Sequence, residues 1–115
     1  MIGVYVENRK RTAPDTSNIT FISQKVPRNQ VVEVESAYIG DYTTANKLLL
    51  LGIRDVGGND VYLAIDQATS TFYTHLDGHV ILLEGESLIG VVASPTTNDV
   101  CYFSVHGKRY RLKEG

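Results

Sequence analysis

Hydrophobic and polar positions alternate along this chain in short runs separated by glycine, proline, asparagine and aspartate. β-Branched and aromatic residues dominate the runs, and alternation with a period of two is typical of strands. The runs are GVYVEN (3–8), NITFISQKV (18–26), QVVEVESAYI (30–39), KLLLLGIRDV (47–56), VYLAID (61–66), HVILLE (79–84), SLIGVVAS (87–94), DVCYFSVH (99–106) and KRYRL (108–112). Because only Gly107 separates the last two, we expect that they form one bent strand.

Eight or nine short strands without intervening helices predict an all-β protein. The expected fold is an antiparallel β-sandwich, or a jelly-roll-like barrel, of about eight strands in a single domain over residues 1–115. Residues 1–16 are expected to give an N-terminal edge strand and a basic arm. The leucine run 47–56 leaves a partly helical segment open, although Gly52 and the flanking turns favour a strand. A parallel α/β fold is not expected, because no strand alternates with a helical pattern.

Glycine-containing turn signals mark where these strands end. GGND (57–60) predicts a hairpin, Asp77-Gly78 predicts another, and Gly85 predicts a tight turn between Glu84 and Glu86. A glycosidase needs two carboxylates that face each other across a cleft, usually from separate elements. Two carboxylates at i and i+2 of a turn do not meet that need. Glu84 and Glu86 are therefore interpreted as exposed turn residues and not as a catalytic pair.

His75, Asp77 and His79 are the best candidates for metal ligands, since histidine and aspartate bind metals and their spacing is compact. A closed zinc site needs four ligands, which Cys101 and the distant His106 do not supply. The stretch HLDGHVILLEGE invites comparison with the cupins, but its histidine spacing differs from theirs. We therefore predict no metal, no cofactor, no catalytic residue and no enzymatic activity, with a metal-dependent jelly-roll enzyme as a minor alternative. Cys101, in an apolar run, is predicted to be a small buried core residue.

The net charge of −2 is unevenly distributed. Residues 1–28 carry a net of +3 and residues 108–115 another +3, whereas residues 29–107 hold ten acids against Lys47 and Arg54, a net of −8. This asymmetry predicts basic ends that meet an acidic surface, such as the middle of a neighbouring copy. The predicted partner-binding residues are Arg9, Lys10, Arg11, Lys108, Arg109, Tyr110 and Arg111.

Other partner classes fit the chain less well. An acidic chain would repel a phosphate backbone, so nucleic acid is not the expected partner. No apolar run approaches the roughly 18 residues of a membrane helix, and MIGVYVENRK lacks the pattern of a signal peptide. Seven tyrosines are many for this length; strand propensity explains them, and clustered tyrosines would also serve a protein interface or a sugar-binding face.

The order of these motifs resembles small β-sandwich accessory proteins of tailed-bacteriophage virions. The resemblance covers residues 18–106 and lies in structural motifs. These motifs are Val26-Pro27 before a strand, the leucine-rich strand Leu48–Ile53, the strand Tyr62–Ile65, the segment Leu82–Leu88 around Gly85, and the segment Thr97–Phe103 with Asn-Asp before an aromatic strand.

This resemblance implies a non-enzymatic virion structural protein, assembled in the host cytoplasm. Within that class, a short single domain favours a capsid decoration or cement protein that docks on or between major capsid subunits. The implied partners are a major capsid or tail protein and further copies of the chain. The alternative is a tail- or fibre-associated module that binds a carbohydrate or receptor through its tyrosines.

Overall fold

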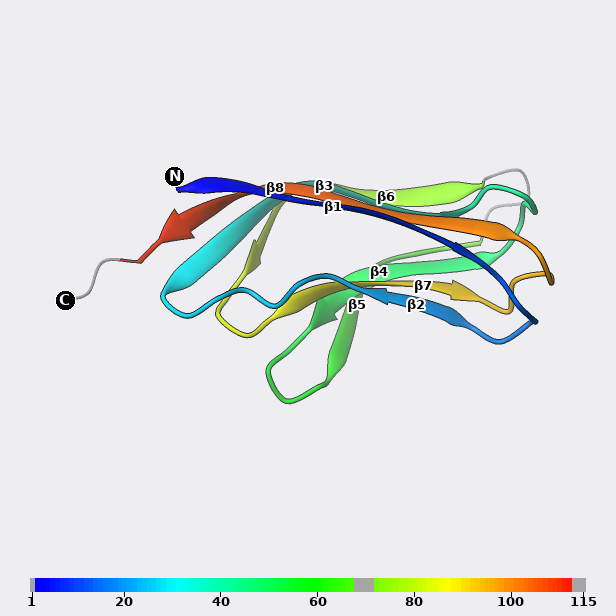
Figure 1. The fold of residues 1–115 in the computed structure, drawn as a ribbon, viewed down its shortest axis with the longest axis horizontal. Helices are drawn as coiled ribbons and strands as arrows, with labels where there is room; N and C mark the ends of the chain where they lie inside the picture. Colours follow the sequence, from blue (N-terminus) through cyan, green and yellow to red (C-terminus); the bar gives the residue numbers. More distant parts are fainter. Residues whose placement is uncertain (1, 68–71, 113–115) are drawn as a thin grey trace.

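The chain folds into two four-stranded antiparallel sheets that pack face to face (Figure 1). A computed structural model describes residues 2–67 and 72–112, apart from the side chains of residues 77–79. The strands are β1 (Gly3–Thr12), β2 (Ile19–Ile22), β3 (Gln30–Asp41), β4 (Leu48–Arg54), β5 (Asp60–Asp66), β6 (Tyr73–Leu82), β7 (Ser87–Ala93) and β8 (Val100–Arg111). The strand order is β1-β8-β3-β6 in one sheet, called sheet A, and β2-β7-β4-β5 in the other, called sheet B.

The strands pair in a nested pattern. β1 lies beside β8, β2 beside β7, β3 beside β6 and β4 beside β5, and consecutive pairs alternate between the two sheets. This nesting of two Greek keys is a jelly roll. The predicted all-β, antiparallel sandwich of about eight strands is therefore confirmed.

The core lies between the sheets and is built by the inward-facing half of each alternating pattern. Phe103 of β8 stacks on Phe21 of β2 with ring centroids 5.5 Å apart, so one aromatic pair joins the two sheets. A Cβ on Gly90 of β7 would lie 2.7 Å from the Phe103 ring, which explains the glycine at that position. Each large apolar side chain buried here contributes about 1.5–3 kcal/mol to folding.

Three of the turn and strand predictions are confirmed. GGND forms the β4–β5 hairpin, in which Asp55 N–H donates to Asn59 O over 2.8 Å. The leucine run is strand β4. Gly85 adopts a φ of +80°, and Glu86 N–H donates to Leu83 O over 3.0 Å, closing a tight turn. The two strands beside this turn belong to different sheets.

The predicted hairpin at Asp77-Gly78 is wrong, because both residues lie within β6. β3 offers a long row of backbone hydrogen-bonding groups, and β6 pairs with it from Tyr73 to Asp77 and again from Val80 to Leu82. A register shift between Val34 and Ser36 accommodates this stretch as a β-bulge. Asp77 and His79 were candidates for metal ligands in the sequence, and their side chains lie outside the described residues.

The basic arm that we expected near the N-terminus is part of the sandwich. β1 continues to Thr12, and Arg9, Lys10 and Arg11 pair with Phe103, Tyr102 and Cys101 of β8. An open strand edge gains hydrogen bonds from such pairing, so the extension is favoured even where the side chains are charged. None of the described residues forms a helix, and accordingly none of them builds a membrane-crossing one.

Candidate functional site

Four of the seven tyrosines gather on the outer face of sheet A. Residues opposite each other in neighbouring strands share a face, and β3 places Tyr38 opposite His75 and Gly40 opposite Tyr73. On the other side, Gly40 lies opposite Tyr102 of β8. The space that Gly40 leaves is taken by Tyr42, whose ring would lie 3.1 Å from a Cβ at that position. One glycine thus lets three rings from three segments meet.

These side chains form a continuous group, called here the tyrosine cluster: Tyr38, Tyr42, Tyr73, Tyr102 and His75. The rings of Tyr42 and Tyr102 meet edge to face with centroids 4.8 Å apart. The ring centroid of Tyr73 lies 6.4 Å from that of Tyr42 and 6.0 Å from that of Tyr38. Burial, and then the neighbouring phenols, raise the pKa of Tyr42 above its usual value. The four tyrosines remain 38–46% exposed, so the cluster faces solvent.

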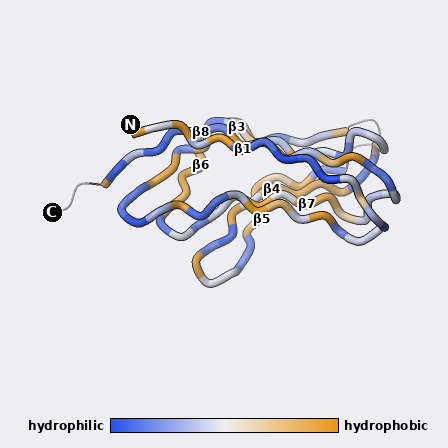
Figure 2. The backbone as a smooth tube through the Cα atoms, viewed as in Figure 1, coloured by the Kyte–Doolittle hydropathy of each residue, from blue (hydrophilic) through white to orange (hydrophobic). Residues whose placement is uncertain are grey.

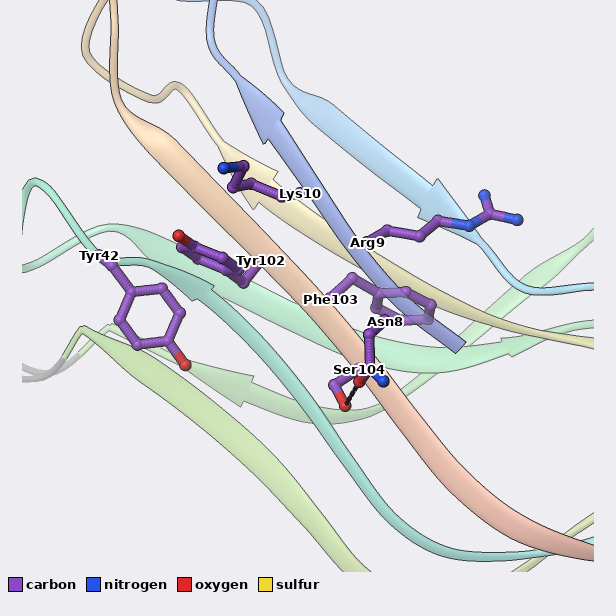
Figure 3. Close-up of a pocket in the computed structure, with 7 residues that line it drawn as sticks. All are labelled: Asn8, Arg9, Lys10, Tyr42, Tyr102, Phe103 and Ser104. Atoms are coloured by element: carbon purple, nitrogen blue, oxygen red, sulfur yellow. Dashed lines mark hydrogen bonds between the residues drawn. The ribbon is translucent and has the colours of Figure 1, made fainter. Parts of the chain in front are cut away.

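A shallow recess of about 530 Å³ opens beside the cluster. Its lining is Asn8, Arg9 and Lys10 of β1, Tyr42, and Tyr102, Phe103 and Ser104 of β8 (Figure 3). The Ser104 hydroxyl donates to Asn8 Oδ1 over 2.6 Å, which places an amide and a hydroxyl side by side. Lys10 lies opposite Tyr102 in the strand register, and no carboxylate of the described residues lines the recess.

A buried carboxyl pair supports the loop that carries Tyr42. Asp41 ends β3 at 1% exposure, and its Oδ1 accepts hydrogen bonds from the backbone N–H groups of Thr43 and Thr44. Asp99, also 1% exposed, accepts from the Thr44 hydroxyl over 2.8 Å and from Thr96 N–H over 2.9 Å. The two carboxyls therefore tie the β3–β4 loop to the β7–β8 loop.

The pKa values of the two carboxyl groups are shifted in opposite directions. Burial, and the adjacent Asp99, raise the pKa of Asp41 to about 6. Burial alone would raise the pKa of Asp99 too, but hydrogen bonds from Asp41, Thr44 and Thr96 outweigh it and lower that pKa. As a carboxylate, Asp41 would keep its buried Oδ2 without a hydrogen-bond partner. Once protonated, the group becomes a donor to Asp99.

Cys101 is fully buried, as predicted. Burial and the negative charges of Asp41 and Asp99 raise the pKa of its thiol to about 12. A thiolate nucleophile is therefore strongly disfavoured at this position.

The carboxylates of Glu84 and Glu86, beside Gly85, accept hydrogen bonds from backbone N–H groups. Glu84 Oε1 accepts from Asn29 N–H over 3.1 Å, and Glu86 Oε1 accepts from Leu83 N–H over 2.7 Å. His75 lies in the tyrosine cluster. Within the described part of the chain, no three histidine, cysteine or acidic residues gather as a metal site would require.

The two basic segments that the sequence singled out lie at opposite ends of sheet A. Antiparallel pairing sets residues 3–4 beside 108–109, whereas residues 9–11 lie beside 101–103. Arg9 is paired with Glu7 at 2.7 Å, and the second half of β1 is hydrophilic (Figure 2). Arg11 Nη1 is 3.5 Å from the carbonyl oxygen of Thr20.

The second segment is more closely packed. Lys108 Nζ lies 3.8 Å from Glu35 Oε2. The guanidinium carbon of Arg109 lies 5.7 Å from the ring centre of Tyr5. Tyr110 is half-buried opposite Val31, and Arg111 is exposed opposite Gln30. The structure thus brings only Arg9 and Lys10, of the seven predicted residues, to the recess.

Sequence reasoning missed the recess and the carboxyl pair. The spacing Tyr38-Gly40-Tyr42 is a signal that could have indicated an aromatic face with a gap, since residues at i, i+2 and i+4 of a strand share a side. No local signal joins Asp41 to Asp99.

Comparison with known proteins assigns no family to the chain. No protein-family model and no curated protein matches the chain. The NLP core of Drosophila, whose crystal structure bears on pentamer formation and histone binding, is 15% identical with a TM-score of 0.47, covering 92% of this chain and 98% of its own. The CBM22-1 xylan-binding domain of Xyn10C from Paenibacillus barcinonensis is 21% identical with a TM-score of 0.36, covering 78% and 60%. Similarity at this level carries no functional argument.

Proposed function

We propose that the chain is a non-enzymatic structural protein that self-associates within a larger assembly. In this proposal, the β4–β5 hairpin of one copy docks on the next copy where β1 begins and β8 ends. That second surface is called here the terminal end, and it comprises Ile2, Val4, Arg28, Arg111 and Leu112. The observation that carries the proposal is the apolar surface of the hairpin.

The β4–β5 hairpin exposes four large apolar side chains. Val56 is 73% exposed, Val61 59%, Leu63 49% and Ile65 63%. They belong to a hairpin that projects from the sandwich body (Figure 1). β5 is also an edge strand, paired only with β4, so its outer backbone groups are open to another chain. Clustered apolar exposure of this kind is typical of a protein interface.

A second copy offers a surface of matching chemistry. At the terminal end, Ile2 is 45% exposed, Val4 65% and Leu112 50%. Arg28 and Arg111 are exposed there, and neither pairs with a carboxylate among the described residues. Residues 54–66 of the hairpin hold Asp55, Asp60 and Asp66 against Arg54, a net of −2. Apolar contact and opposite charges therefore favour the same head-to-tail arrangement.

A head-to-tail contact repeats, because each copy keeps one hairpin and one terminal end free for a neighbour. Such contacts close into a ring or continue as a filament. Weak contacts summed over many copies give a stable assembly. From the motifs of residues 18–106, we propose a bacteriophage virion as that assembly and capsid decoration or cementing as the role.

The direct test is the effect of a charge placed on the hairpin. Ile65→Glu puts a carboxylate in the apolar contact, and we expect it to weaken self-association at least tenfold, because the charge would be desolvated there. Phe72→Glu is the matched control, since Phe72 is a 42% exposed apolar residue outside both surfaces. Sedimentation equilibrium of the three proteins gives the association constants. An Ile65→Glu protein that associates as tightly as the wild type would refute the proposed interface.

A further inference from the structure

The exposed surface of the tyrosine cluster has the size of a small ligand. Four tyrosines at 38–46% exposure present roughly 300 Å² of accessible surface, taking about 200 Å² for each whole side chain. A small ligand, or one residue of a polymer, covers a surface of this size.

The recess combines aromatic and polar groups in the way that a sugar requires. A pyranose ring has an apolar C–H face and a rim of hydroxyl groups. The rings of Tyr42 and Tyr102 offer the apolar surface, and Asn8 and Ser104 offer an amide and a hydroxyl beside them (Figure 3). Mixed lining of this kind, mostly apolar with a few placed polar groups, is typical of small-molecule sites.

The charged side chains of the recess distinguish acidic sugars from neutral ones. Arg9 is held by Glu7 at 2.7 Å, so its charge is largely balanced. Lys10 is exposed and pairs with no carboxylate within the described part of the chain. One unbalanced ammonium beside the aromatic surface favours a ligand with a single negative group on each sugar.

Single-stranded nucleic acid fits this surface less well. It also stacks on aromatic rings, but it needs a groove of cations that follows successive phosphates. The recess offers one unbalanced lysine, and the net charge of the chain is −2.

We propose that this recess binds a carboxylated sugar, a uronic acid residue of an acidic glycan. Tyr42 and Tyr102 pack against the sugar ring, Asn8 and Ser104 bond its hydroxyls, and Lys10 pairs with its carboxylate. The recess lies at the far end of sheet A from the terminal end, so binding does not depend on self-association.

The test is an NMR titration of the isotopically labelled chain with tetragalacturonate and, separately, with its neutral methyl ester. We expect tetragalacturonate to shift the backbone amide signals of Lys10, Tyr42, Tyr102 and Ser104. The ester keeps the sugar ring and loses the charge, so we expect it to bind about threefold more weakly.

Variants separate the two parts of the site. Tyr42→Ala and Tyr102→Ala should each weaken binding of both ligands about tenfold, whereas Tyr42→Phe should retain it. Tyr110→Ala, outside the cluster, is the matched control. Lys10→Gln should remove the preference for the acid over the ester, and Lys25→Gln, at an exposed lysine elsewhere, should keep it. Ile65→Glu should bind like the wild type, so a failure of self-association would be distinguished from a failure here.

Three results would overturn the proposal. The first is the absence of shifts at millimolar concentrations of either ligand. The second is equal affinity for the acid and the ester in the wild type. The third is tighter binding of octathymidylate at the same amides, which would assign the recess to single-stranded nucleic acid.

Discussion

The buried carboxyl groups of Asp41 and Asp99 support the part of the tyrosine cluster that Tyr42 contributes. Each bonds a backbone N–H of a different loop, and together they fix the segment on which Tyr42 stands. Tyr42 N–H in turn donates to Val100 O over 3.0 Å. The carboxyls are far apart in the sequence and flanked by ordinary turn residues, so their meeting could not be predicted. The burial of Cys101 could be predicted, because it lies in the apolar run VCYFSV and a free cysteine behaves as a small hydrophobic residue.

The Asp41 carboxyl should make stability depend on pH. Its folded-state pKa of about 6 lies above the unfolded value near 3.9, so folding binds a proton between these values. Its stabilising contribution is complete below about pH 4 and is lost as the pH rises through 6. Asp99, with a lowered pKa, acts in the opposite sense, and its contribution is lost only at lower pH.

Asp41→Asn tests this prediction. The amide cannot ionise and donates permanently toward Asp99. We expect the wild type to lose about 1–2 kcal/mol of unfolding free energy between pH 5 and pH 7, and the variant to lose much less. Urea unfolding at each pH measures both. Parallel pH profiles for the two proteins would show that Asp41 does not titrate in this range.

Among the secondary-structure elements, most strands could be predicted from local sequence pattern. The course of β6 could not, because it depends on pairing with β3. The runs that became β4, β5 and β7 were recognisable from their apolar residues and flanking turns. Asp77-Gly78 has a strong turn signal, yet it lies within β6, because β3 pairs with β6 on both sides of it, at Asp77 and at Val80. The same bulge places Ser36 opposite His106 on the outer face, although alternation from Val34 predicts the inner face. A bulge leaves no mark in the local sequence that alternation could detect.

Gly107 allows β8 to pass this bulge as one strand. A Cβ on Gly107 would lie 2.3 Å from the carbonyl oxygen of Glu33, so an alanine forces the strands apart. We expect Gly107→Ala to lower the unfolding free energy by about 1–3 kcal/mol. Gly3→Ala is the control, because no atom of the described residues lies within 4 Å of its added Cβ. Urea unfolding compares the two, and equal stabilities would contradict the close approach.

In the molecule as a whole, the nested strand pairing creates surfaces to which several strands contribute. It brings tyrosines from β3, β6 and β8 to one face and separates the two basic segments to opposite ends. The all-β class could be predicted from strand spacing, since it needs only local pattern. The hairpin itself was predicted from GGND, but the cluster, the recess and the exposure of the hairpin's apolar side chains could not be, because each depends on which strands become neighbours.

The most direct test of the central claim is the absolute mass of the chain in solution, by light scattering after gel filtration at low and high sodium chloride. We expect a mass of at least twice 12.7 kDa at low salt. We also expect a shift toward the monomer at high salt, because opposite charges contribute to the contact. A monomer at every concentration and salt level would contradict self-association through the hairpin and the terminal end.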